Sequence, residues 1–207
     1  MAGRRDRGMQ EKLSRILAAA SELFDARGFA AVTTQQISDR ADVAAGTLFR
    51  YATTKGELLL MVYNERYRAV IEQGATRAAA TSGADAVMAF VSPVIRWAEQ
   101  HPENSTAYQR ELMFGPAGER FRDEGLTLVG EFEDRISGIL RAEHPAREQD
   151  ASAAARTIFS VVHIAIARLA FHPHTAEDAA QLRQQIDQII TGFRAATRTE
   201  PQGKERQ

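Results

Sequence analysis

Two threonine-led capping signals near the N-terminus fix where two helices of this chain begin. Thr33 and Gln36 form a Thr-x-x-Gln capping box, in which each side chain bonds the main chain of the other residue. Thr54 and Glu57 repeat the arrangement as Thr-x-x-Glu. We therefore expect the segment between the two signals to hold two short helices joined by a tight turn.

The turn between these short helices is placed at Asp42, because aspartate tolerates a left-handed backbone better than most residues. The helix before it is expected over about 34–41, and the helix after it over about 44–52. This is the layout of a helix-turn-helix, whose second helix enters the DNA major groove by its N-terminal end. Small residues there let the backbone approach DNA, while Thr47 and Arg50 can donate to phosphates or base edges.

Apolar residues at helical spacing continue along almost the whole chain. They predict a first helix over about 10–27, ended by Gly28, and a series of helices after residue 54. No strand pattern, repeat or low-complexity run is found in the sequence. The fold class expected is therefore all-α.

Composition and charge exclude several classes of protein. The chain of 207 residues has no Cys, so disulfides and thiolate metal sites are excluded. Its net charge of −1 argues against a non-specific nucleic-acid binder, but residues 1–57 hold nine Lys or Arg against seven Asp or Glu. The net positive charge of this segment suits a DNA-binding domain. No apolar signal segment follows the basic start, so a cytoplasmic location is expected.

Several spacings around the capping signals agree at once with one known family. They involve Gly28-Phe29, Thr33-Thr34, Ile37, the run from Ala41 to Tyr51, Thr54-Lys55 and Leu58-Leu59. Residues 9 to about 67 therefore closely resemble the DNA-binding domain of the TetR family. The rest of the chain resembles that family only in its length and its helical pattern.

The resemblance implies a homodimeric transcriptional regulator, usually a repressor, with two all-α domains and no cofactor. The N-terminal domain would be a three-helix helix-turn-helix that binds a palindromic operator. The larger C-terminal helical domain would bind a small-molecule effector and dimerise. The boundaries expected are a flexible basic arm over 1–8, the DNA-binding domain over 9–55, the effector-binding and dimerisation domain over 56–196, and a disordered tail over 197–207.

Carried over to this sequence, the resemblance assigns DNA contacts to the starts of the second, third and fourth helices. The residues are Thr33, Thr34, Gln35, Gln36, Ala44, Ala45, Gly46, Thr47, Phe49, Arg50, Tyr51 and Lys55. Three positions depart from the family pattern, which has Gly at Asp42, Ser or Thr at Ala44, and Phe at Ala52. The missing cap at Ala44 costs about 1 kcal/mol of helix stability. None of these departures removes a DNA contact.

Aromatic residues and methionine in the second domain are candidates for an effector pocket, although large apolar residues at helical spacing more often form plain core. His163 is polar on an otherwise apolar helix, so it is a candidate for orienting a ligand. The alternative is a histidine satisfied within the core. The candidate set is Phe90, Trp97, Tyr108, Met113, Phe114, Phe159 and His163. It favours a hydrophobic effector.

The last two helices are expected to carry the dimer contact. The helix that begins near residue 150 is apolar nearly all round, so it must be covered on every side. One side can pack on its own domain, and the other can meet a second copy in a two-fold four-helix arrangement. The interface residues predicted are Ile158, Val162, Ile166, Leu169, Leu182, Ile186, Ile189, Ile190 and Phe193. The alternative is a monomer with one deeply buried helix.

The sequence contains no recognised catalytic or metal-binding constellation. His172 and His174 are close in sequence but have no further ligand at helical spacing, and nucleophile and phosphate-loop motifs are absent. We therefore expect no enzyme activity, no metal and no membrane partner. Two alternatives stay open: a DNA-binding regulator without an effector, and an all-α enzyme or carrier with a vestigial headpiece.

Overall fold

The computed structural model describes residues 3–145 and 147–195, and within these ranges it contains nine helices and no strand. The helices are α1 (Arg4–Ala31), α2 (Thr34–Arg40), α3 (Ala45–Leu48), α4 (Lys55–Ala78), α5 (Gly83–Gln100), α6 (Pro102–Phe114), α7 (Arg120–Glu143), α8 (Glu148–Arg168) and α9 (Ala176–Ala195). The all-α fold class is confirmed. The tail predicted over 197–207 lies outside the described residues.

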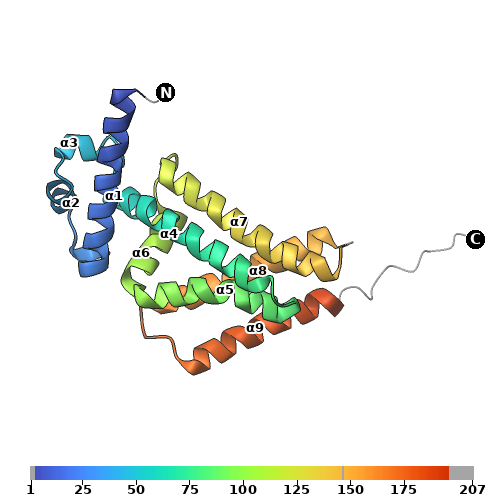
Figure 1. Cartoon of the computed structure of the whole chain (residues 1–207). Coiled ribbons are helices and arrows are strands. Elements are labelled where there is room, and N and C mark those ends of the chain that lie inside the picture. The colour runs from blue at the N-terminus through green and yellow to red at the C-terminus, as the bar shows by residue number, and fades with distance from the viewer. Residues whose placement is uncertain (1–2, 146, 196–207) are drawn as a thin grey trace, which may run out of the picture.

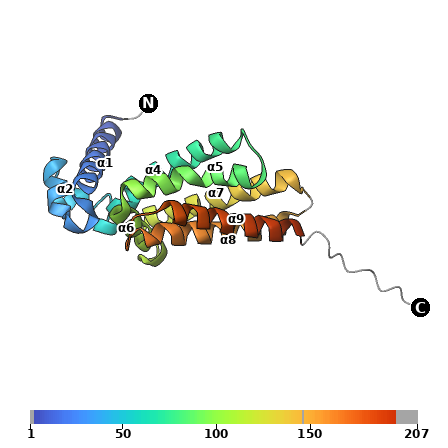
Figure 2. The same ribbon diagram turned by 90° about the horizontal axis from the view of Figure 1, so that it is seen from below.

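Helices α1 to α3 form a small headpiece at one end of the molecule, and α5 to α9 form the larger body (Figure 1). Helix α4 begins in the headpiece and runs into the body, where α5 and α7 pack against it. Helices α8 and α9 lie side by side along one side of the body (Figure 2).

Two hydrophobic clusters of buried residues stabilise this arrangement, and α4 contributes to both. The headpiece cluster contains Phe24 and Ile37, together with the start of α4 at Leu58. The body cluster contains Ile71, from the second half of α4, and Phe132 from α7. Helix α4 therefore connects the headpiece to the body through both clusters.

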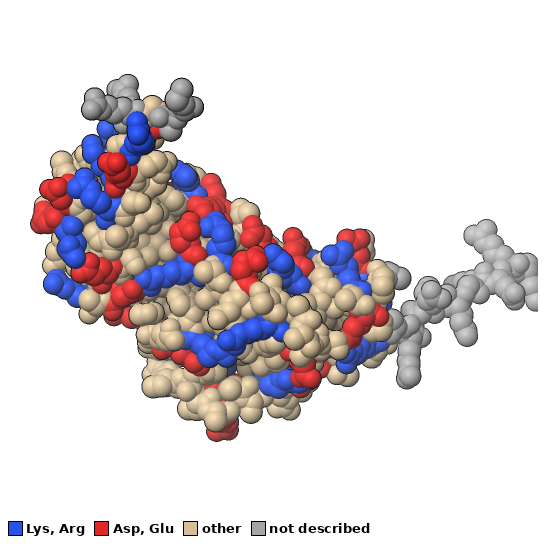
Figure 3. Space-filling view, viewed as in Figure 1, with Lys and Arg blue, Asp and Glu red and all other residues tan. Residues whose placement is uncertain are grey.

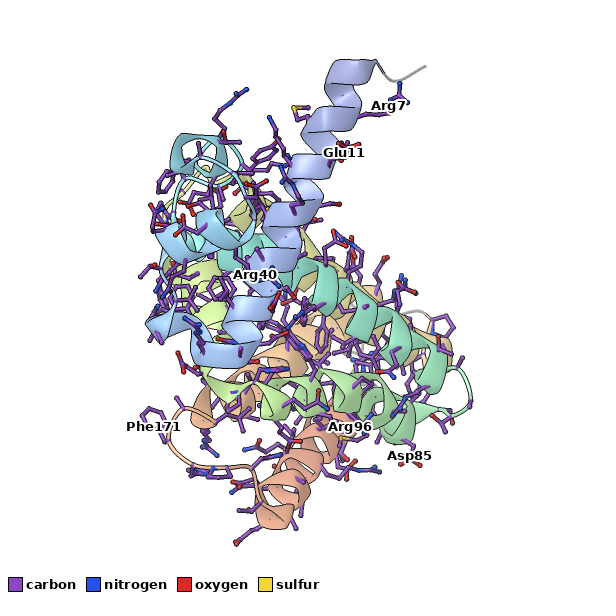
Figure 4. All side chains as sticks on the ribbon, turned by 60° about the vertical axis from the view of Figure 1, so that its left-hand side comes forward. Arg7, Glu11, Arg40, Asp85, Arg96 and Phe171 are labelled. Atoms are coloured by element: carbon purple, nitrogen blue, oxygen red, sulfur yellow. The ribbon has the colours of Figure 1, made fainter. Side chains whose placement is uncertain are left out.

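Helix α1 begins at Arg4, whereas a flexible arm was predicted over 1–8 and a helix start near residue 10. The early start has a local cause, because the Gly3 main-chain N–H donates to the Asp6 carboxylate at 3.1 Å. This bond satisfies one of the free N–H groups at the helix end. Arg7 therefore projects from a helical turn at the tip of the headpiece (Figure 4).

Gly28, where the first helix was predicted to end, interrupts α1 with a φ of 76° and a ψ of 160°, and the helix then continues to Ala31. A Cβ atom at this position would collide with the carboxylate of Glu103, on α6. The same carboxylate accepts a hydrogen bond of 2.8 Å from the Ala30 main-chain N–H. Glycine at position 28 therefore permits both the left-handed backbone and the close approach of α6.

Helix α8 is long and apolar enough to cross a membrane by length and composition alone. Its inward residues, among them Ile158 and Val162, belong to the body cluster. Packing against α7 and α9 explains the apolar residues on the inward side of α8.

Candidate nucleic-acid interface and ligand site

The start of α2 is fixed by the capping box that the sequence predicts. The Gln36 main-chain N–H donates to Thr33 Oγ1 at 3.2 Å, and the Thr33 N–H donates to Gln36 Oε1 at 2.9 Å. The amide oxygen of Gln36 is thereby used within the chain. Gln35 is exposed, and its Nε2 atom donates to Asp39 at 2.7 Å.

The turn after α2 has the left-handed residue that was expected. Asp42 has a φ of 51°, and the Val43 N–H closes the turn on the Ser38 carbonyl at 3.0 Å. The Asp42 carboxylate also lies 3.0 Å from Arg15, on α1. Both side chains are well exposed, so this ion pair contributes little to stability.

Helix α3 is shorter than predicted, because it spans Ala45–Leu48 rather than 44–52. Ala44 precedes it without a side-chain cap, and Leu48 is its single buried residue. The chain continues through Phe49, Arg50 and Tyr51 in further turns. With no capping hydroxyl and little burial, the sequence cannot maintain a longer regular helix here.

The surface of α3 has features that the fold itself does not require. A Cβ atom at Gly46 would meet no other atom within 4 Å, so no packing in the chain calls for glycine there. Phe49 is 44% exposed, and the exposed Arg50 makes no hydrogen bond or ion pair with the described residues. A glycine open to solvent beside an exposed aromatic and a free guanidinium suits close approach by DNA.

Most of the predicted DNA-contacting residues lie together on this surface. Thr33, Gln35, Ala44, Gly46, Phe49 and Arg50 are exposed, and Thr34, Gln36, Ala45, Thr47 and Tyr51 are partly exposed. The Tyr51 hydroxyl donates to the Met9 carbonyl at 3.0 Å, which ties α1 to the end of this surface. Basic and acidic side chains are interspersed over the headpiece on the face seen in Figure 3.

Lys55 does not join this surface. Its Nζ atom donates to the main-chain oxygens of Phe29 and Val32, at 2.9 and 3.0 Å, with a longer contact of 3.4 Å to Ala30. It also lies 4.3 Å from the centre of the Phe29 ring. All three ammonium donors thus face the end of α1, so Lys55 fastens α4 to the headpiece rather than gripping a phosphate.

The body contains a narrow, mainly apolar cavity between α4, α5, α6, α7 and α8, with a volume of about 30 Å³. Four of the seven predicted pocket residues line it: Trp97, Tyr108, Phe159 and His163. Phe90 is fully buried against Phe132 instead, with ring centres 4.9 Å apart. Met113 and Phe114 lie at the end of α6 and are 41% and 84% exposed. These three predicted residues do not line this cavity, because helical spacing does not tell a cavity wall from a core or a surface position.

Polar atoms in this cavity come mainly from α6 and α8. Burial raises the pKa of Tyr108, and its hydroxyl donates to Asn64 on α4 at 2.9 Å. Gln109 Nε2 donates to the main-chain oxygen of His163 at 3.2 Å. Burial also lowers the pKa of His163, so its imidazole is neutral at pH 7. Ser105, Tyr67 and Gln109 line the cavity beside the predicted residues.

Helix α6 connects this cavity directly to the headpiece. Ser105 lines the cavity, while the preceding residue, Asn104, donates to the Phe24 carbonyl of α1 at 2.8 Å. Glu103 accepts from Ala30, also on α1, as described above. Of three consecutive residues on α6, Glu103 and Asn104 therefore bond α1, and Ser105 lines the cavity.

Seven of the nine predicted dimer-interface residues are buried inside the chain itself. They are Ile158, Val162, Ile166, Leu182, Ile186, Ile190 and Phe193, all of which belong to the body cluster. These residues cannot meet a partner while the fold is intact, so that assignment is corrected. Leu169 and Ile189 are partly exposed.

The outward side of α8 and α9 carries a different set of apolar residues. Ile164 is 53% exposed, and it lines a groove of about 180 Å³ with Val161 and Leu169. Phe171, in the connection between the two helices, is 86% exposed and projects from the body (Figure 4). In the part of the chain that the structure describes, no three His, Asp or Glu side chains come together as a metal site.

Comparison with known proteins gives one family. The model of the bacterial regulatory proteins of the tetR family matches residues 16–62. The HTH-type transcriptional repressor KstR of Rhodococcus jostii is 28% identical over 152 residues, which cover 73% of this chain and 69% of KstR.

Solved structures show the same fold over most of the chain. FadR from Bacillus subtilis, in complex with stearoyl-CoA, has a TM-score of 0.65 and 18% identity, covering 87% of this chain and 98% of FadR. FadR from Thermus thermophilus, a TetR-family repressor in complex with lauroyl-CoA, has a TM-score of 0.65 and 22% identity, covering 92% and 98%.

Proposed function

Because this chain is a member of the TetR family of bacterial regulatory proteins, and therefore a DNA-binding transcriptional regulator, we propose that it is a repressor. A small, mainly apolar effector would release it from a palindromic operator. The surface of α3 carries the DNA-binding part of this proposal, because Gly46 is open and Phe49 and Arg50 are exposed there. Packing within the chain does not explain why glycine, phenylalanine and arginine occupy these three positions.

The dimer that a palindrome requires is proposed to form through the outward side of α8 and α9. Only 33% of the most apolar stretch of α8 is buried inside the chain, and Ile164 is among its exposed residues. A second copy would cover this surface in a two-fold contact. Such a dimer can place two α3 helices in successive major grooves, roughly 34–36 Å apart.

The effector site is proposed to be the cavity lined by Trp97, Tyr108, Phe159 and His163. Its apolar walls suit a hydrocarbon chain or ring system, and two relatives of the same fold were solved with acyl-CoA molecules. A volume of about 30 Å³ holds one or two water molecules. The walls must therefore move apart to admit an acyl chain, and this movement would be the signal.

Helices α4 and α6 are proposed to transmit the signal. Helix α4 contributes Tyr67 to the cavity wall and is fastened to α1 by Lys55. Helix α6 contributes Ser105 and is fastened to α1 through Asn104. Allosteric coupling of about 1–3 kcal/mol, which is typical, changes operator affinity about 5- to 150-fold.

One observation favours a second candidate, a DNA-binding regulator without an effector. The cavity is narrow. If the body had no space for a ligand, DNA binding would be controlled by the abundance of this protein or by a protein partner. The two candidates differ in whether a ligand changes operator affinity.

The test is to select genomic DNA fragments with the purified full chain and to footprint the best binder. Adding lauroyl-CoA to that complex then tests release. A two-fold symmetric footprint that weakens at least 5-fold with lauroyl-CoA or another apolar ligand supports the repressor. A symmetric footprint unaffected by a panel of apolar ligands supports the regulator without an effector, and the absence of sequence preference contradicts both.

A further inference from the structure

Ser105 differs from seven other Ser and Thr residues in the long helices of this protein. Its side chain is buried at 2% exposure, and its Oγ atom has no hydrogen-bond partner in the described part of the chain. Helical Ser and Thr hydroxyls commonly donate to the carbonyl four residues earlier. Those of Thr76, Ser92, Thr106, Thr127, Ser152, Thr157 and Ser160 do so here. Ser105 has such a carbonyl, that of His101, but its hydroxyl does not bond it.

A buried hydroxyl without a partner is costly, by about 1–3 kcal/mol. Its cost is offset when a ligand supplies the missing bond. Ser105 lines the cavity of the body, where such a ligand would lie. Nothing in its packing requires a hydroxyl, because the group bonds no described residue.

The same cavity offers a second polar group, the imidazole of His163. The ring makes no hydrogen bond with the described residues and packs against Phe159, with ring centres 5.5 Å apart. As a neutral imidazole, it has one donor and one acceptor nitrogen. Among the described residues that line the cavity, none is Lys, Arg, Asp or Glu. A charged ligand group would therefore enter without a counter-charge, which is unfavourable in an apolar site.

We propose that Ser105 and His163 recognise a single uncharged polar group, such as a ketone, ester, thioester or hydroxyl, on an otherwise apolar effector. This inference rests on the proposed function, since it names the chemistry of the effector at that site. It requires that any phosphate or carboxylate of the same molecule stay outside the cavity. The Ser105 hydroxyl donates a hydrogen bond to an oxygen atom of the ligand.

Trp97 supplies the measurement, because it is the single tryptophan of the chain and lines the cavity. Its fluorescence is titrated with three probes of one chain length: 2-decanone, decanoate and n-decane. We expect 2-decanone to bind most tightly and decanoate most weakly. Ser105→Ala should weaken 2-decanone about 3- to 10-fold, the loss of one neutral hydrogen bond, and should leave n-decane unchanged.

Ser92→Ala is the matched control, because Ser92 donates to the Met88 carbonyl within α5 and does not line the cavity. It should leave all three affinities unchanged. The melting temperature gives an independent measurement. Ser105→Ala should raise it by about 2–4 °C by removing an unpaired buried hydroxyl, whereas Ser92→Ala should not.

Equal binding of 2-decanone by the Ser105→Ala variant and the natural chain would overturn the inference, as would tighter binding of decanoate than of 2-decanone. If lauroyl-CoA still released operator DNA in that case, the proposed function would stand while the inference failed. If no probe and no acyl-CoA altered Trp97 fluorescence, the effector site itself would be wrong.

Discussion

The side-chain amide of Asn104, on α6, donates a hydrogen bond of 2.8 Å to the main-chain oxygen of Phe24, on α1. Asn104 is 3% exposed, and the next residue along α6 lines the cavity. We therefore expect a change in the cavity that shifts α6 to act on α1. The hydrogen bond is therefore one residue along α6 from the cavity wall.

Replacement of Asn104 by Ala should weaken the coupling between the two sites. We expect the free energy of unfolding to fall by about 1 kcal/mol, because one hydrogen bond is lost. Without ligand, the operator affinity of the variant should stay within a few-fold of that of the natural chain. The decrease in operator affinity that lauroyl-CoA causes should be smaller than in the natural chain. DNA-binding anisotropy with and without the ligand measures both. Thr106→Ala, on an exposed face of the same helix, is the control, and an undiminished ligand effect in Asn104→Ala would rule out this route.

Gly46→Ala should separate stability from DNA binding. An added Cβ meets no atom of the chain, and Ala favours a helix over Gly by up to about 1 kcal/mol, so the variant should be slightly more stable. The methyl group would nevertheless obstruct DNA, so operator affinity should fall 10-fold or more. Gly130→Ala, equally open on α7, should gain stability without losing DNA binding. Unchanged operator affinity in Gly46→Ala would show that DNA does not approach this residue.

Arg50 is expected to read a base rather than only a phosphate. Its guanidinium is exposed and has no partner among the described residues. If it bonds a guanine with both nitrogens, Arg50→Ala should cost about 1–3 kcal/mol on the operator and relax specificity at one base pair. Binding to operator and to scrambled DNA measures the difference. Equal losses on both would reassign Arg50 to the phosphate backbone.

Ile164→Glu should dissociate the proposed dimer. In a two-fold interface the substitution occurs twice, once in each subunit, and each copy would place a charge among apolar residues. The free energy of dimerisation should therefore weaken by about 2–4 kcal/mol or more. Light scattering at micromolar concentration measures it. Leu126→Glu, at a residue 38% exposed on α7, is the control and should leave the dimer intact. A natural chain that is already monomeric, or an Ile164→Glu dimer of full strength, would refute the assignment of this surface.

His163 should make stability depend on pH below neutrality. Burial lowers its pKa in the folded chain from the ordinary 6.5, so the unfolded chain binds a proton more readily. The contribution of neutral His163 to the free energy of unfolding is fully present above pH 6.5. It is lost as the pH falls below 6.5 and passes through the lowered pKa of the folded chain. Urea unfolding between pH 7.5 and 5 should therefore show a steeper loss for the natural chain than for His163→Gln. Parallel curves would mean that the imidazole is not protected from protonation.

The local features of the headpiece were predictable because neighbouring residues determine them. The capping box at Thr33 and the left-handed Asp42 follow from side chains within a few positions of each main-chain group. Lys55 was placed correctly at the start of α4, but its side chain turns to the end of α1. That direction depends on how α1 packs against α4, which no local pattern contains.

The assignments that failed in the body concern which face of a helix meets which neighbour. Periodicity identified α8 as apolar on several faces, but it could not tell that Ile158 faces the chain's own core while Ile164 faces outward. Ser105 gave no signal in the sequence, since a serine in a polar stretch resembles many surface residues. Its unpaired hydroxyl becomes evident only once α6 is packed against the body.

We expect this chain to bind one DNA sequence in preference to others. The most direct measurement is the ratio of dissociation constants for the best selected fragment and a scrambled fragment of equal length, at 0.15 M salt. We expect a ratio of about 1,000 or more, as in specific protein–DNA recognition. A ratio near one would contradict the account, because the headpiece would then bind DNA, if at all, through charge alone.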